Sequence, residues 1–270
     1  MPLCPECGGP LRRDGQRSRP TRVYCSRKCL GQAQSRQAEA HLNLSAFVGW
    51  SSEMAYALGL FFSDGSLQPQ KGSWSVRFYN SDWSTIQWWQ KYLQDARTPV
   101  VRLPGKQAPV GANGKKYITK KTSWVAQVSS RTLGEQLFAL GAVPRKSFQP
   151  IRVPQVPAAY LPCFLRGLFD GDGSIYTYKG RTGGSRLSVE VLSNSEPFRQ
   201  DLVLLLEAAG IRHPAQHGIS VRMCGGDAER FCRWIYSLEG PRMSYKYERW
   251  LTWQEMRAGV GGLICMKEAA

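Results

Sequence analysis

The sequence predicts an α+β fold made of two halves that each run αββαββα, preceded by a small cysteine-rich unit. The main observation is an internal repeat: residues 59–66, GLFFSDGS, return as residues 167–174, GLFDGDGS, with six of the eight positions identical. Each copy ends an apolar stretch and precedes residues that alternate between apolar and polar, which is typical of a helix followed by a half-buried strand. Four cysteines crowded before residue 30 indicate the separate N-terminal unit.

The composition is that of a folded, basic protein. The chain has 270 residues, 42% of them hydrophobic, so it can bury a sizeable core and is not expected to be disordered. No membrane span or secretory signal is visible, so we expect an intracellular protein that is neither secreted nor inserted in a membrane. Lys and Arg number 36 against 20 Asp and Glu, which gives a net charge of +16. Such an excess favours a polyanionic partner.

Residues 1–40 carry a candidate metal site. The spacing is Cys-x2-Cys, then seventeen residues, then Cys-x3-Cys, formed by Cys4, Cys7, Cys25 and Cys29. Four thiolates at this spacing suit a structural, tetrahedral Zn²⁺, which would supply folding energy to a segment rich in Gly, Pro and Arg. The alternative is a disordered basic arm with incidental cysteines. Residues 34–50 are expected to form a linker.

The first element of each half is predicted to be a helix. The stretches Met54–Phe62 and Leu161–Phe169 are apolar and long enough for helices, and Pro162 is tolerated in a first turn. Each helix should end at its Asp-Gly pair, because glycine readily takes the left-handed backbone geometry that follows many helices.

The remaining elements follow in matching order. Apolar residues at 74, 76 and 78 and at 187, 189 and 191 alternate with polar ones, which predicts a strand in each half with one face on a core. Capping residues at 80–82 and 193–196 predict helices at roughly 83–95 and 196–209. Strands at 124–128 and 219–223 and third helices at roughly 131–140 and 226–237 complete the halves, which a Pro-rich stretch at 144–157 joins.

With these residues in view, the chain resembles the LAGLIDADG homing endonucleases in their single-chain, two-motif form. The motif falls on 57–65 (ALGLFFSDG) and 165–173 (LRGLFDGDG); the second copy matches closely, whereas the first departs at its first, second, fifth, sixth and seventh positions. The residues around 24–29 are similar to small zinc modules fused to mobile-element nucleases. Beyond the cysteine module at 1–40, which lies outside the core family, the resemblance implies two pseudo-symmetric subdomains at 41–150 and 151–270, with saddle-shaped antiparallel sheets, in a monomer.

The motif residues have expected roles in such an enzyme. Small Gly59 and Gly167 would let the two helices meet at a pseudo-twofold interface and so bring Asp64 and Asp172 together. Adjacent carboxylates repel, and a hard divalent cation relieves the repulsion. We therefore expect Mg²⁺ (or Mn²⁺) there, serving in-line hydrolysis of a phosphodiester.

The resemblance also implies a basic residue in each site and a DNA-binding face on the sheets. Lys146 and Lys246 stand at the corresponding places, where they would aid proton transfer or stabilise charge. The sheet face opposite the core is expected to enter the major groove, where Arg reads guanine and Gln reads adenine. Its candidate contacts are Gln68, Gln70, Ser75, Arg77, Tyr79, Ser123, Gln127, Tyr176, Tyr178, Arg186, Ser188, Glu190, Ser220 and Arg222. A lysine-bearing loop, 104–121, is expected to follow the phosphate backbone.

Together with these residues, the resemblance implies a site-specific endonuclease that cuts both strands of a long, asymmetric DNA target. Two other functions on the same fold stay open: a DNA-binding regulator that has lost cleavage, and a maturase that binds group I intron RNA. Loss of cleavage usually removes the acids, whereas Asp64 and Asp172 are both present, which favours the nuclease.

Overall fold

The computed structural model describes residues 3–11, 23–103, 122–181 and 183–267. Its first half contains α2 (Ser52–Asp64), β1 (Gly65–Gln70), β2 (Ser73–Asn80), α3 (Trp83–Leu93), β3 (Val100–Arg102), β4 (Ser123–Ser129) and α4 (Arg131–Ala139). Its second half contains α5 (Leu161–Asp172), β5 (Gly173–Lys179), β6 (Ser185–Leu192), α6 (Glu196–Ala208), β7 (Ala215–His217), β8 (Ser220–Cys224) and α7 (Gly226–Ile235). Two short 3₁₀ turns lie between the halves, η1 (Lys146–Phe148) and η2 (Ala158–Tyr160).

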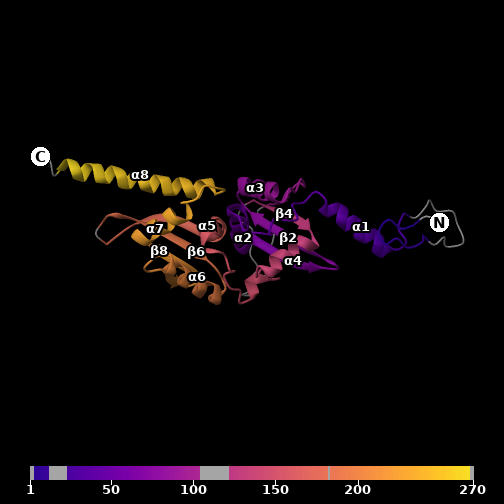
Figure 1. Cartoon of the computed structure of the whole chain (residues 1–270). Coiled ribbons are helices and arrows are strands. Elements are labelled where there is room, and N and C mark those ends of the chain that lie inside the picture. The colour runs from indigo at the N-terminus through magenta and orange to yellow at the C-terminus, as the bar shows by residue number, and fades with distance from the viewer. Residues whose placement is uncertain (1–2, 12–22, 104–121, 182, 268–270) are drawn as a thin grey trace.

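Each half holds one four-stranded antiparallel sheet, and the strand orders are equivalent. They run β1-β2-β4-β3 and β5-β6-β8-β7. The registers correspond as well, since Gly65 pairs with Phe78 in the first sheet and Gly173 pairs with Val191 in the second. The duplicated αββαββα order and the two sheets confirm the predicted α+β fold class (Figure 1).

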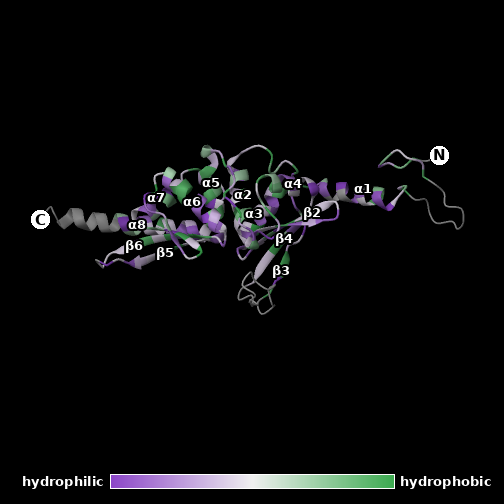
Figure 2. Cartoon of the chain, turned by 90° about the horizontal axis from the view of Figure 1, so that it is seen from below, coloured by the Kyte–Doolittle hydropathy of each residue, from purple (hydrophilic) through white to green (hydrophobic). Residues whose placement is uncertain are grey.

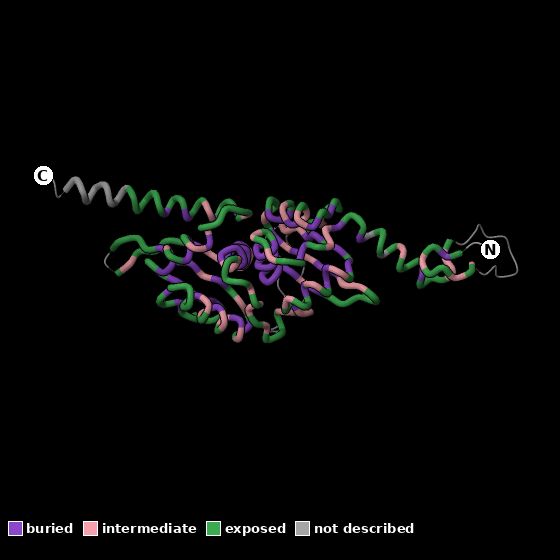
Figure 3. The backbone as a smooth tube through the Cα atoms, viewed as in Figure 1, coloured by how far each residue is buried: buried purple, intermediate pink, exposed green. Residues whose placement is uncertain are grey.

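Helices α2 and α5 lie side by side at the centre of the molecule (Figures 1 and 3). Both are buried almost throughout, over residues 54–63 of α2 and 162–170 of α5. Helices that are covered on all sides need apolar residues all round, which explains why these stretches show no polar face. The pair is therefore the shared core of the two halves.

Both motif helices end at the expected glycines, but not through the left-handed geometry that the sequence analysis expected. Gly65 has φ −81° and Gly173 has φ −94°, and both lie in the extended region. A Cβ added at either position would lie 2.4 Å from the carbonyl oxygen of Phe61 or Phe169. Glycine is needed here because the strand leaves the helix at close range.

Two further helices lie outside the duplicated unit, toward opposite ends of the molecule (Figure 1). Helix α1 (Arg27–Glu39) covers residues 34–39, so the linker predicted at 34–50 was wrong over that stretch. Its sequence is mostly polar, with Leu30 as its one large aliphatic residue, which left no apolar period to detect. Helix α8 (Ser244–Lys267) follows the second half and buries Trp250 and Trp253.

The two sheets lie on one side of the molecule, and α4, α6 and α7 lie on the other (Figure 2). Inward-facing Val76 and Phe78 of β2 are fully buried, as are Val189 and Val191 of β6. The residues that alternate with them face away from the helices. Among the described helices, none combines the length and the apolar character that crossing a membrane requires.

Candidate active site

Two glycines bring the motif helices into backbone contact. A Cβ added to Gly59 would lie 2.1 Å from the carbonyl oxygen of Phe164, and one added to Gly167 would lie 2.1 Å from that of Tyr56. No side chain fits at such distances, so only glycine allows this approach. The contact is reciprocal, because each glycine meets the residue three positions before the other glycine. The two helices are thus related by a local pseudo-twofold axis.

Asp64 and Asp172 stand at the adjoining C-terminal ends of these helices. A Cβ added to Gly171, which directly precedes Asp172, would lie 3.2 Å from Asp64 Oδ2. The side chain of Asn80, at the end of β2, donates a hydrogen bond of 3.0 Å to the same oxygen. The pairing of α2 with α5 therefore gathers the two acids into one half-buried site.

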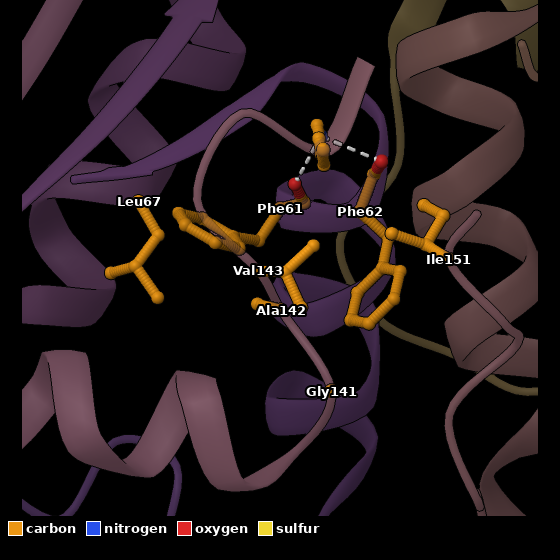
Figure 4. Close-up of a pocket in the computed structure, with 8 residues that line it drawn as sticks. Phe61, Phe62, Leu67, Gly141, Ala142, Val143 and Ile151 are labelled. Atoms are coloured by element: carbon orange, nitrogen blue, oxygen red, sulfur yellow. Dashed lines mark hydrogen bonds between the residues drawn. The ribbon is translucent and has the colours of Figure 1, made fainter. Parts of the chain in front are cut away.

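A lysine lies beneath the end of each motif helix. Lys146 Nζ donates three hydrogen bonds of 2.5–2.7 Å to the carbonyl oxygens of residues 61–63. Two of these bonds, to Phe61 and Phe62, are drawn in Figure 4. Lys246 Nζ donates two, of 2.6 and 2.8 Å, to the carbonyl oxygens of residues 169 and 170. A cation is stabilised at a helix C-terminus, where carbonyl groups lack partners within the helix.

The four ionisable groups perturb one another. Burial, followed by the nearby charge of Asp172, raises the pKa of Asp64 to about 7. Burial also raises the pKa of Asp172 above its usual value. Burial among apolar side chains lowers the pKa of Lys146 to about 8, and burial lowers that of Lys246 to about 8, although nearby acids act in the opposite direction. Strongly shifted groups that converge on one place are typical of a functional site.

The donor set fits a hard divalent cation. Asp64 and Asp172 offer carboxylate oxygens, and burial together with their mutual repulsion raises the pKa of Asp64 and so opposes full ionisation of both. A divalent cation relieves such repulsion, and Mg²⁺ and Mn²⁺ prefer oxygen ligands.

The expected DNA contacts share one face of each sheet. In the first sheet Arg77 pairs with Gln127, and in the second Glu190 pairs with Arg222, in equivalent registers. The exposed members are Gln68, Gln70, Gln127, Tyr176, Tyr178 and Arg186, and the half-buried members are Arg77, Tyr79, Ser123, Glu190 and Arg222. The loop 104–121 lies outside the described residues.

Three serines on this face are not free side chains, so that expectation was wrong for them. Ser75, Ser188 and Ser220 have exposed fractions of 0%, 1% and 4%. Ser75 and Ser188 lie on central strands beside longer side chains of the neighbouring strand, Gln68 and Tyr176 respectively. Ser220 donates instead to the backbone carbonyl of His217 at the end of β7. Alternation along a strand predicts the face of a residue but not its accessibility.

The four N-terminal cysteines meet in one cluster. The sulfur atoms of Cys4, Cys7, Cys25 and Cys29 all lie within 4.8 Å of one another, and Cys25 Sγ lies 3.4 Å from both Cys7 Sγ and Cys29 Sγ. All four thiols are free. Hydrogen bonds with Cys7 and Cys29 raise the pKa of Cys25 to about 12, whereas, although burial acts against the shift, hydrogen bonds with neighbouring groups lower the pKa of Cys4 to about 6. Four sulfurs gathered in this way fit tetrahedral Zn²⁺.

Sequence reasoning missed several polar residues at the site. It treated Asn80 only as part of a helix cap, although the amide donates to Asp64. Arg166 and Asp170, inside the second motif, are fully buried, and Asp170 accepts hydrogen bonds from the Tyr56 hydroxyl and from a backbone amide just before α8. The available signal was the presence of these two charged residues within an apolar stretch of the helix. Buried charges are normally paired, so both residues could have been expected to have polar partners.

The fold and the site define a class: a duplicated αββαββα chain whose two central helices pair through glycines and end in adjoining carboxylates. Within it, residues 161–221, from the start of α5 into β8, match the LAGLIDADG-like domain. No curated protein matches the chain.

Solved structures that are similar to this chain are distant in sequence. The homing endonuclease I-WcaI, bound to its DNA recognition sequence, is 15% identical, with 80% of this chain and 91% of that chain covered and a TM-score of 0.48. I-GzeII, in complex with a DNA target, is 13% identical, with 79% and 92% covered and a TM-score of 0.45. Full-length DUF199/WhiA from Thermatoga maritima is 13% identical, with 87% and 74% covered and a TM-score of 0.36.

Proposed function

We propose that this protein is a site-specific endonuclease that hydrolyses both strands of duplex DNA with a divalent metal. The observation that carries the proposal is the meeting of Asp64 and Asp172 at the ends of two helices that touch through glycine. Each acid comes from one half of the chain, so one chain supplies a complete pair and we propose that it acts as a monomer.

Asp64 and Asp172 are the proposed ligands of Mg²⁺ or Mn²⁺. Such an ion would supply Lewis-acid stabilisation of the oxygens at the scissile phosphate and an activated water. Asn80 holds Asp64 in position through its hydrogen bond to Oδ2. The short reach of an Asp side chain at a rigid helix end limits how far either carboxylate can move, which keeps the site organised before DNA binds.

Lys146 and Lys246 are proposed to stabilise negative charge rather than to carry protons. All three N–H bonds of Lys146 are already donated to carbonyl oxygens at the end of α2. An ammonium in this state offers no lone pair to accept a proton. Its positive charge still acts on the acids, because Asp172 and Asp64 raise the pKa of Lys146 against the effect of burial. Lys246 fills the equivalent place under α5.

The two sheet faces form the proposed cradle for DNA. They lie on the same side of the molecule (Figure 2), and their strands β1 and β5 directly follow the helix ends that carry the acids. The net charge of +16 favours a polyphosphate partner and a strong salt dependence of binding. Because equivalent positions differ between the sheets, as in Arg77 and Glu190, the proposed target is asymmetric.

The cysteine cluster is proposed to be a structural zinc module that extends the DNA contact. Cys29 lies in the first turn of α1, so a metal there would anchor the start of that helix. At the other end of α1, the Glu39 carboxylate accepts a hydrogen bond of 2.6 Å from the backbone amide of Arg131 at the start of α4. Helix α1 would then connect the module firmly to the first half.

The test is to incubate the full chain with duplex DNA from its own locus, with Mg²⁺ or without added metal. Paired cuts at one position that require Mg²⁺ support the proposal. Intact DNA bound tightly with Mg²⁺ present would favour the regulator, and preferential binding to folded intron RNA would favour the maturase.

A further inference from the structure

The exposed face of the second sheet carries a network to which all four strands contribute. Glu190 of β6 is the centre of it and accepts hydrogen bonds from the Tyr176 hydroxyl of β5 and from Arg222 Nε of β8. On the far side, Arg222 Nη2 lies 3.4 Å from His217 Nδ1 of β7. Glu190 and Arg222 are paired in one row of the sheet, whereas Tyr176 pairs with Ser188 and His217 pairs with Ser220, in the neighbouring rows. The side chain of Arg222 is 33% exposed while that of Glu190 is 15% exposed.

The network fixes the arginine rather than the acid. Although burial acts against it, hydrogen bonds from Tyr176 and Arg222 lower the pKa of Glu190, so the carboxylate stays ionised at neutral pH. A carboxylate that accepts from Nε prevents rotation of the guanidinium about its last bonds. The guanidinium is then held in one orientation, in which Nη2 lies 3.4 Å from His217 Nδ1 and the side chain stays partly exposed.

A guanidinium whose Nε is already bonded presents two parallel N–H donors from Nη1 and Nη2. Guanine offers two acceptors at matching spacing, O6 and N7, on its major-groove edge, and no other base offers such a pair. We propose that Arg222 reads one guanine in the half of the target that lies on the second sheet, with Glu190 as the residue that positions it. This inference rests on the proposed function, because it requires duplex DNA on this face.

The first sheet is built differently at the equivalent row. Arg77 occupies the place of Glu190, and Gln127 occupies the place of Arg222. Within the described residues no acid bonds to Arg77, and its Nε is buried without a hydrogen-bond partner. The first sheet therefore has no arginine fork held by an acid at this row, and the two halves of the target must be read by different chemistry there.

Two other roles for this pair give different results when tested. A phosphate contact by Arg222 would weaken binding to all sequences equally. Direct reading by Glu190 would select cytosine through its N4 amino group, and the preference would then depend on the acid and not on the arginine fork.

The experiment is selection of bound duplexes from a randomised DNA pool, with the full chain and no added Mg²⁺ so that the DNA stays intact. The wild-type protein should enrich a guanine at one position of one half-site. Arg222→Lys keeps the charge but lacks the fork, so the preference for that guanine should fall roughly ten- to hundredfold while the rest of the selected site is unchanged. Glu190→Gln should weaken the same position only.

Gln127→Ala is the matched control, since it changes the equivalent place in the first sheet and should leave this guanine unaffected. Three outcomes would overturn the inference but not the proposed function. They are an unchanged selected site with Arg222→Lys, a uniform loss of affinity for all sequences, and a loss of the guanine preference seen only with Glu190→Gln. A wild-type protein that enriches no sequence would overturn both the inference and the proposed function.

Discussion

The hydroxyl of Tyr56 in α2 donates a hydrogen bond of 2.8 Å to Asp170 Oδ2 in α5, across the interface of the two motif helices. The equivalent pair on the other side of the pseudo-twofold axis is apolar: Phe164 and Phe62 meet edge to face, with ring centroids 6.1 Å apart. The pseudo-twofold symmetry of the two helices is therefore broken inside the core, where one of the two equivalent pairs is polar. Asp170 also accepts from the backbone amide of Met243, which ties this pair to the segment before α8.

Tyr56→Phe should destabilise the fold. The change leaves the buried Asp170 carboxylate with one donor fewer, at a cost of about 1–3 kcal/mol in the free energy of unfolding. Urea denaturation measures this cost. Tyr178→Phe, on the exposed sheet face, is the control and should have little effect; equal midpoints for wild type and Tyr56→Phe would contradict the role of the hydrogen bond.

Gly59→Ala should disrupt the helix pair. The new methyl group would overlap the carbonyl oxygen of Phe164, and overpacking of this kind costs about 1–3 kcal/mol or more. Gly31→Ala in α1 is the matched control, because its Cβ would meet open space and alanine stabilises a helix interior by about 0.5–1 kcal/mol. The two variants should shift thermal unfolding in opposite directions, and a tolerated Gly59→Ala would contradict the close contact.

Metal binding should depend on pH through Asp64. A proton and a cation compete for its carboxylate, and the pKa of Asp64 is raised to about 7 by burial and by Asp172. Affinity for Mn²⁺ should therefore rise as the pH increases toward about 7 and level off above it, with a proton released on binding below that pH. Calorimetric titration from about pH 5.5 to pH 8 tests this. Asp64→Asn should bind weakly and lose the rise in affinity that ends near pH 7; a flat profile for the wild type would count against a shared acid site.

The N-terminal module should contain one tightly bound zinc ion. Cys25→Ser removes a sulfur from the cluster, so zinc content measured by elemental analysis should fall and residues 1–40 should become sensitive to protease. Cys224→Ser, an exposed cysteine on β8, is the control and should keep the metal. A wild-type protein without zinc, still protected from protease, would rule out the metal as the source of order.

The core of the fold could be predicted because its signals are local. The repeated Asp-Gly ends and the alternation along β2 and β6 depend only on neighbouring residues, so α2, α5 and the order of elements followed from the sequence. Helix α1 was missed because it has no apolar face, and Ser26 at its N-cap was its main local signal.

The details of the site depend on contacts between distant segments, which no local pattern reports. Asn80 reaches Asp64 only because the end of β2 returns to the end of α2. Ser75 faces the expected side of its strand yet is buried beside a longer neighbour. The pairing of Glu190 with Arg222 likewise follows from the register of β6 with β8.

Cleavage by the Asp64→Asn and Asp172→Asn variants tests the central claim most directly. On a DNA site that the wild-type protein cuts with Mg²⁺, each variant should fail to break both strands while binding the same DNA, because each removes one of the two carboxylates that meet between α2 and α5. Asp201→Asn, in the middle of α6, is the control and should cut normally. Double-strand cleavage that continues unchanged in either motif variant would contradict the shared acid site.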